Sequence, residues 1–216
     1  PKLKEFMLGT ANLALPSFAC GETHDTPRLA ARDGGRNFAK MLAVMNMFVP
    51  NGIPFINSGQ EVYETQPMNT GLDCRPNEAY MLDPSDPYYG KLALFDKFAI
   101  HYLNHMRWDI PDNLEKVKNI RNEYLTTITN VKNYMPVNFE NNNTFGFAYK
   151  LPNKQILLIV ANANPYEPSS TKALVYDLRK KCKNDSIVGE LLYGMHERGA
   201  RRFLEFDEWK NPYFFM

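Results

Sequence analysis

Phe18-Ala-Cys-Gly-Glu22-Thr23-His24-Asp25-Thr-Pro-Arg28 is the stretch around which the rest of the chain is organised. It begins as a short, half-apolar run and ends in an imidazole next to a carboxylate. Extended runs of this kind bring side chains to the carboxyl end of a strand, where α/β proteins hold their active sites. The pattern predicts a strand over residues 17–22 and makes His24 and Asp25 the first candidates for site residues.

A helix and a second strand are expected directly after this stretch. Gly34-Gly35 interrupts the chain, and apolar residues then recur at steps of three and four until Pro50. These apolar residues are Phe38, Met41, Leu42, Met45, Phe48 and Val49. Such a stripe is typical of a core-facing helix rather than of a methionine-rich cofactor site. The apolar run 53–58 between two glycines predicts a fully buried strand, so we expect a right-handed βαβ unit with parallel strands.

The remaining sequence changes character twice. Residues 60–89 are polar, proline-rich and aperiodic, and a long loop that follows a strand is expected to be functional rather than disordered. Apolar periodicity then predicts helices at about 92–106 and 114–128, separated by Pro111. From residue 131 onward, short apolar runs between turn residues predict an antiparallel β module. Its expected strands cover residues 137–139, 144–150, 155–161, 171–176, 189–193 and 203–206.

Composition limits the classes of function. The 216 residues, 44% hydrophobic and 23% charged, are typical of a globular protein with a substantial core. A formal net charge of +1 provides no electrostatic footprint for nucleic acid or for a membrane surface. No apolar run approaches the roughly 18 residues that a membrane helix needs. The three cysteines, Cys20, Cys74 and Cys182, are an odd number without metal-ligand spacing, which argues against a disulfide framework and slightly favours the cytoplasm.

Two patterns resemble metal sites only superficially. His101 and His105 lie four residues apart on a predicted helix, but no Glu-x-x-His context accompanies them. Asp83 and Asp86 lie among prolines without the ordered glycine of calcium loops. We therefore expect no cofactor, and the sequence does not support a calcium site.

Three motifs, in this order, resemble the end of the catalytic barrel in the α-amylase superfamily of glycoside hydrolases. Residues 18–28, with His24-Asp25 followed by Thr-Pro-Arg, are similar to the motif at the seventh barrel strand. Gly52-Ile-Pro-Phe-Ile-Asn-Ser-Gly-Gln-Glu61 is similar to the eighth strand, whose family form is Gly-x-Pro, an apolar run and Gly-(Glu/Gln/Asp)-Glu. Asp73-Cys-Arg75 resembles the Asp-x-Arg segment that follows in many members.

Two positions depart from the family pattern. Thr23 lies where asparagine or serine is commoner, and Gly71 lies where some related enzymes have an acidic residue that contacts the next sugar. The resemblance implies a fold class of α/β followed by all-β. Residues 1–130 would form the last strands and helices of a (β/α)8 TIM barrel, and residues 131–216 an antiparallel β-sandwich domain.

The resemblance also implies retaining chemistry on the α-glucosidic bonds of starch, glycogen or maltooligosaccharides. In such enzymes one carboxylate attacks the anomeric carbon and a carboxylic acid protonates the leaving oxygen. Asp25 matches a third carboxylate, which binds the 2- and 3-hydroxyls of the reacting sugar and stabilises the transition state. His24 matches a neighbour that donates to the same hydroxyls, and Arg75 matches a substrate-binding arginine. Arg28 is a further candidate, either for substrate binding or for pairing with a loop carboxylate.

The nucleophile and the general acid of this family lie at the fourth and fifth strands. In this sequence, the only carboxylate side chains before the His24-Asp25 pair are those of Glu5 and Glu22. We therefore expect the chain to be the C-terminal part of a larger enzyme, inactive without the N-terminal part with which it associates. The larger enzyme could be a hydrolase or a glucan- or maltosyl-transferring enzyme, and residues 66–69 are similar to some transferring members. The alternative is a non-catalytic carbohydrate-binding or assembly module of the same fold.

Overall fold

The computed structural model groups the chain into two compact units. It describes residues 5, 8–69, 82–94, 96, 100, 108–152, 155–174, 190–194, 204–206 and 212–215. The first unit comprises Pro1–Ser17, Phe48–Gly52 and Lys116–Met216, and the second comprises Phe18–Met47 and Ile53–Glu115. The units therefore interleave along the chain, and the predicted division at residue 130 stays a prediction.

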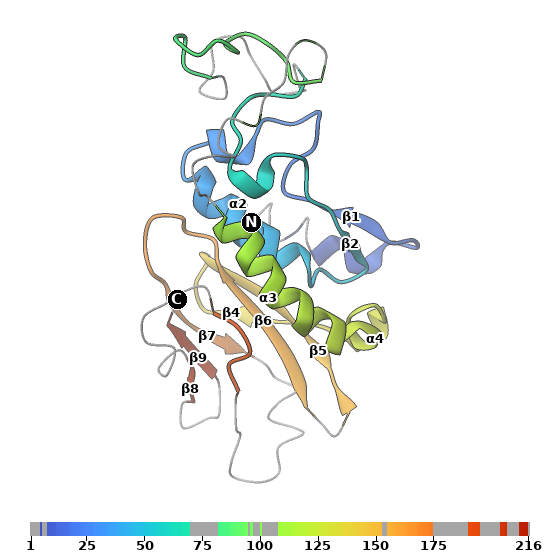
Figure 1. The fold of residues 1–216 in the computed structure, drawn as a ribbon. Helices are drawn as coiled ribbons and strands as arrows, with labels where there is room; N and C mark the ends of the chain where they lie inside the picture. Colours follow the sequence, from blue (N-terminus) through green and yellow to red (C-terminus); the bar gives the residue numbers. More distant parts are fainter. Residues whose placement is uncertain are drawn as a thin grey trace. The chain divides into compact units, whose positions relative to one another are not determined.

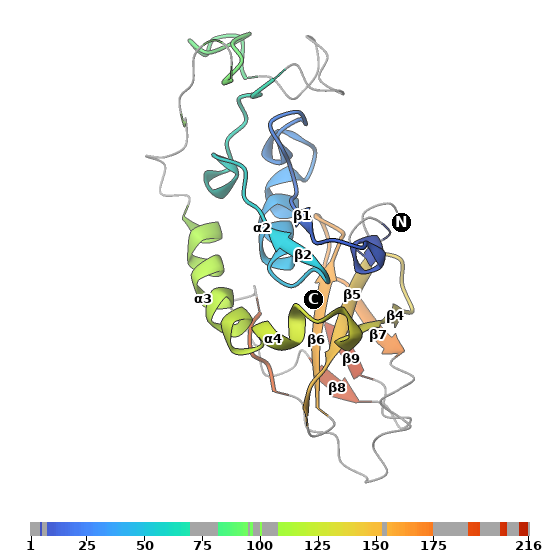
Figure 2. The same ribbon diagram turned by 90° about the vertical axis from the view of Figure 1, so that its right-hand side faces the viewer.

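The opening stretch begins in a two-stranded sheet made of β1 (Ser17–Ala19) and β2 (Gly52–Pro54). The N–H of Ser17 donates to the carbonyl of Asn51 at 3.1 Å, and the N–H of Phe55 donates to Ala19 at 3.0 Å. The residue numbers of the bonded partners increase along both strands in the same direction, which is the pattern of a parallel pair. The chain segment between the two strands contains α2 (Gly35–Asn46), which runs beside them (Figures 1 and 2).

One face of this sheet is apolar and exposed. Phe18, Ile53 and Phe55 are 62%, 46% and 37% exposed, and the rings of Phe18 and Phe55 lie 5.6 Å apart. The prediction of a fully buried strand is therefore wrong for the described residues. Successive side chains of a strand point to opposite faces of the sheet. Ala19 lies on the buried face, whereas Phe18 lies on the face that is exposed. We call Phe18, Ile53 and Phe55 the apolar face.

Helix α2 begins against a single turn of 3-10 helix, η2 (Leu29–Ala31). Gly34, at a φ of 64°, adopts the left-handed conformation that favours glycine. A Cβ at the next position, Gly35, would lie 1.7 Å from the carbonyl oxygen of Leu29. The glycine pair therefore lets the helix start in direct contact with η2. Within α2, Met41, Leu42 and Met45 of the predicted stripe are buried.

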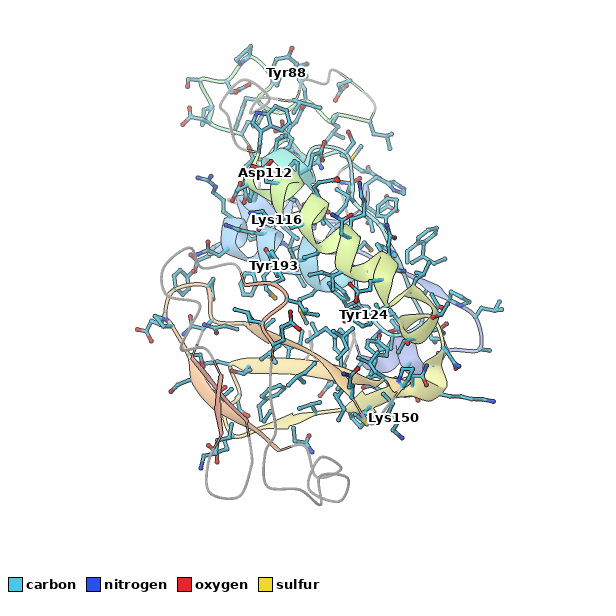
Figure 3. All side chains as sticks on the ribbon, turned by 60° about the horizontal axis from the view of Figure 1, so that its bottom comes forward. Tyr88, Asp112, Lys116, Tyr124, Lys150 and Tyr193 are labelled. Atoms are coloured by element: carbon cyan, nitrogen blue, oxygen red, sulfur yellow. The ribbon has the colours of Figure 1, made fainter. Side chains whose placement is uncertain are left out.

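The helix predicted at about 114–128 starts earlier than the sequence suggests and is divided into two helices. Helix α3 (Asp109–Glu123) contains Pro111 in its first turn, and α4 (Leu125–Ile128) follows. Proline is tolerated there because the N–H groups of a first helical turn have no partner within the helix. Asp112 and Lys116 are placed one turn apart on α3 (Figure 3). Of the predicted helix 92–106, residues 92–94 are not helical and most of the remainder lies outside the described residues.

Two antiparallel sheets build the β module of the first unit (Figure 1). One sheet has the strand order β3-β5-β6 and the other the order β4-β7-β9-β8. The strands are β3 (Tyr134–Pro136), β4 (Asn138–Phe139), β5 (Thr144–Lys150), β6 (Ile156–Asn162), β7 (Ser170–Leu174), β8 (Leu204–Phe206) and β9 (Pro212–Phe215). A single core joins the sheets, since Met135 and Ala148 of one pack in the same cluster as Ala173 of the other.

Most expected strands of this module are present with shifted ends. Strand β5 covers 144–150 as predicted, and its whole length pairs with β6. The predicted strand 189–193 is wrong where it is described, because residues 190–194 are irregular. Strands β3 and β9 were not predicted. Each contains a proline, which is confined to sheet edges and strand starts, and these strands place Pro136 at an edge and Pro212 first.

Candidate active site

A tight turn after β1 presents the predicted pair to solvent. The N–H of Thr23 donates to the Thr26 hydroxyl at 2.8 Å, and the N–H of Thr26 donates back to the Thr23 carbonyl at 3.3 Å. The N–H of Asp25 donates to the Thr23 hydroxyl at 3.2 Å. Threonine closes turns of this kind because its side-chain oxygen can accept a nearby backbone N–H group. The side chains of His24 and Asp25 are left 58% and 51% exposed.

Both oxygens of the Asp25 carboxylate are oriented by neighbours. His24 Nε2 lies 3.2 Å from Asp25 Oδ2, and Asn69 Nδ2 donates to Asp25 Oδ1 at 2.9 Å. A carboxylate held in this way keeps accessible lone pairs, so it can accept hydrogen bonds from hydroxyl groups of a ligand. The neighbouring imidazole can donate to the same ligand. The pair therefore suits recognition of adjacent hydroxyls.

Behind this exposed turn lies a buried ion pair that joins its two ends. Arg28 Nη1 donates to Glu22 Oε1 at 2.7 Å, and these side chains are 0% and 1% exposed. The other oxygen, Glu22 Oε2, accepts the N–H of Leu29 at 2.7 Å, and Asn57 Nδ2 donates to Oε1 at 3.1 Å. The Glu22 carboxylate is thus satisfied by three donors, as a buried charge requires.

Arg28 also holds the segments that follow β2. Its Nη1 donates to the Ser58 carbonyl at 2.7 Å, and its Nε donates to the Gln66 carbonyl at 2.9 Å. The Gln66 N–H in turn donates to the buried Glu64 carboxylate at 2.8 Å. Of the two readings left open for Arg28, pairing with a carboxylate is the arrangement in the described residues, and direct contact with substrate stays a prediction.

Several residues of this arrangement were not singled out from the sequence. Asn57, Glu64 and Asn69 have no motif that marks them as partners of the turn. For Glu22 a signal existed, because two opposite charges flank a short polar turn beside an apolar strand. That pattern is typical of many surface loops too, so it does not by itself distinguish a buried pair from an exposed one.

The remaining candidates separate into described and undescribed residues. Arg75, His101 and His105 lie outside the described residues. Asp83 accepts the N–H and the hydroxyl of Ser85 at 2.9 and 2.6 Å, and Asp86 accepts the N–H of Tyr88 at 2.8 Å. Both carboxylates therefore close turns, and the hydrogen bonds from Ser85 lower the pKa of Asp83. In the described part of the chain, no group of three or more His, Cys, Asp and Glu residues could hold a metal ion.

Two further features of the second unit do not extend the site. A hollow of about 490 Å³ at the start of α2 is lined by Arg36, Lys40 and Asp109 but not by His24 or Asp25. Two of its charged groups pair with one another, since Lys40 Nζ lies 3.3 Å from Asp109, and Arg36 lies over the Tyr63 ring. Near the turn, burial raises the pKa of the Cys20 thiol and the Glu22 carboxylate adds to the effect, which disfavours a nucleophilic thiolate.

No protein-family model matches the chain. No curated protein matches its sequence at a significant level. The resemblance to the α-amylase superfamily therefore stays a prediction. Among the helices that the structure describes, none is both long and apolar enough to cross a membrane.

Proposed function

We propose that this chain supplies the end of the catalytic barrel of a retaining enzyme that acts on α-glucosidic bonds of starch, glycogen or maltooligosaccharides. The observation that carries the proposal is the exposed His24–Asp25 pair, presented at the carboxyl end of a parallel strand on a buried polar support. In this role Asp25 accepts hydrogen bonds from the 2- and 3-hydroxyls of the reacting sugar, and His24 donates to them. Such bonds strengthen as the ring acquires oxocarbenium character, which lowers the barrier.

The covalent steps need two further carboxyl groups about 5–5.5 Å apart. Glu22 is unsuited to either role, because it is 2% exposed and already accepts three hydrogen bonds. We therefore infer that the nucleophile and the general acid come from another part of a larger enzyme, and that this chain alone is inactive. Arg75 is proposed as a substrate ligand of the same site.

The apolar face supports an association with further chain. Phe18, Ile53 and Phe55 are exposed on a parallel pair of strands, whereas parallel sheets are normally covered on both faces. In a closed barrel, side chains from the other parallel strands would cover this face. The substrate class follows from the resemblance, and hydrolysis and transfer differ only in whether water or a sugar hydroxyl reaches the intermediate.

The test is Asp25→Asn in the complete enzyme, assayed on maltooligosaccharides. We expect kcat to fall roughly 10²–10³-fold while KM changes much less, because the lost interaction is strongest in the transition state. Asp33→Asn, at an exposed carboxylate just before α2, is the matched control and should retain full activity. Full activity of a folded Asp25→Asn enzyme would overturn the proposal and favour the non-catalytic carbohydrate-binding or assembly module.

A further inference from the structure

Arg28 connects the three segments that surround Asp25. Through Glu22 it closes the base of the turn that carries His24 and Asp25, with Nη1 and Oε1 2.7 Å apart. Through the Ser58 carbonyl it holds the chain that leaves β2. Through the Gln66 carbonyl it holds the segment that continues to Asn69, the residue that donates to Asp25. A single guanidinium therefore anchors both the carboxylate and the partner that orients it.

We propose that Arg28, held by Glu22, is a positioning residue for Asp25 and Asn69. This inference rests on the proposed function of Asp25. Arg28 does not touch substrate in this arrangement, since its side chain is 0% exposed. It acts by fixing the turn and the Asn69 segment relative to one another, so that the Asp25 carboxylate meets the sugar hydroxyls in one orientation.

The geometry requires an arginine in particular. Its rigid, planar fork directs Nη1 and Nε to acceptors on different segments at 2.7 and 2.9 Å. The remaining nitrogen, Nη2, is buried without a hydrogen-bond partner among the described residues. Nη2 lies on the side of Gly59, where an added Cβ would come within 3.4 Å of it. A lysine would keep the charge but would not reach the three acceptors together.

The main test is Arg28→Lys in the complete enzyme, compared with Arg36→Lys. Arg36 lies over the Tyr63 ring at 4.8 Å in the same unit and is exposed, so it is a matched control outside the site. We expect Arg28→Lys to lower kcat roughly 100-fold with little change in KM, because small misplacements of a catalytic group have effects of this size. Arg36→Lys should leave both constants unchanged. Equal kcat for the two variants would overturn the inference.

Hydrogen exchange separates positioning from general loss of stability. In Arg28→Lys, amide exchange should rise in residues 22–29, 57–60 and 64–69 and stay unchanged in β5 and β6. If exchange rises everywhere in proportion to lost activity, Arg28 is merely structural and the inference is wrong. Should Arg28→Lys not fold, Asn69→Ala tests the same link at a half-buried side chain, with kcat expected to fall about tenfold.

The outcomes distinguish this inference from the proposed function. Full activity of Asp25→Asn overturns the proposed function, whatever Arg28→Lys does. Inactive Asp25→Asn together with fully active Arg28→Lys or Asn69→Ala overturns only the positioning role. Loss of activity in all three folded variants, with increased exchange confined to the three segments that Arg28 holds, supports both.

Discussion

At the scale of single residues, Glu22 and Asp25 are two carboxylates in one short segment with opposite environments. Glu22 is 2% exposed and accepts hydrogen bonds from Arg28, Leu29 and Asn57. The Asp25 side chain is 51% exposed and is oriented by His24 and Asn69. Burial and full satisfaction make the first a support, whereas access and partial satisfaction leave the second able to bind a ligand.

A third polar residue, Tyr149, is buried in the first unit and gives a stability prediction. Its hydroxyl donates to the carbonyl of Phe48 at 2.5 Å, and its side chain is 0% exposed. In Tyr149→Phe this buried carbonyl loses its donor, so the free energy of unfolding should fall by about 1–3 kcal/mol in urea titrations at pH 7. Tyr166→Phe, at a side chain 63% exposed, is the control and should change it little.

The same residue predicts a dependence on alkaline pH. Burial raises the pKa of Tyr149 above the ordinary tyrosine value of about 10, so the folded state retains a proton that the unfolded chain releases. Stability is therefore complete below about pH 10 and falls as the pH rises further. In Tyr149→Phe this contribution is absent, so the difference in unfolding free energy between the two proteins should narrow above pH 10. A constant difference across that range would contradict the assignment.

At the scale of elements, the sequence predicts those whose side chains repeat with a clear period. The stripe in α2 and the hairpin of β5 and β6 are present because local periodicity and core burial agree there. The sequence did not predict where α3 starts, nor the strands β3 and β9, and each of these elements contains a proline. Proline is tolerated in a first helical turn, in an edge strand or at a strand start, but only the tertiary structure shows which of these applies. Arg28 binds residues from segments that are far apart in the sequence, and a single sequence does not show which segments meet in space. The sequence therefore predicts Asp25 as a site residue more readily than the buried residues that hold its turn.

Helix α2 provides the prediction at this scale. In Gly35→Ala the new methyl group would lie 1.7 Å from the Leu29 carbonyl oxygen, so either α2 or η2 must move. We expect the free energy of unfolding to fall by about 1–3 kcal/mol, as overpacking does in well-packed cores. Gly9→Ala is the matched control, because no atom of the described residues lies within 4 Å of its added Cβ and its φ is –61°. Chemical denaturation of the two variants under identical conditions makes the comparison, and equal stability would show that η2 yields freely.

At the scale of the whole molecule, the apolar face is the feature that calls for a cover. Phe18 and Phe55 form a contiguous exposed pair, whereas an exposed residue such as Leu125, on a short helix of its own, is ordinary.

This face predicts how the isolated chain interacts with an apolar dye. The chain should bind anilinonaphthalene sulfonate, and Phe18→Ser should lower the fluorescence far more than Leu125→Ser, because it removes the most exposed member of the apolar face. The complete enzyme should bind little dye, since the face is then covered. Equal effects of the two substitutions would mean that the apolar face does not act as one surface.

The Asn51-Gly52 junction before β2 has a different consequence, for chemical ageing. Asn51 Nδ2 donates to the carbonyls of Thr10, Leu13 and Leu15 at 3.2, 3.0 and 3.1 Å, and the N–H of Gly52 donates to Val49 at 3.1 Å. Deamidation of an Asn-Gly pair proceeds when the glycine nitrogen attacks the asparagine side chain to form a succinimide. The fold engages the asparagine amide nitrogen and the glycine N–H in other hydrogen bonds, so we expect the reaction to be slower in the folded chain than in the opened chain. Deamidation at this junction should therefore accumulate faster in samples in which the chain has opened.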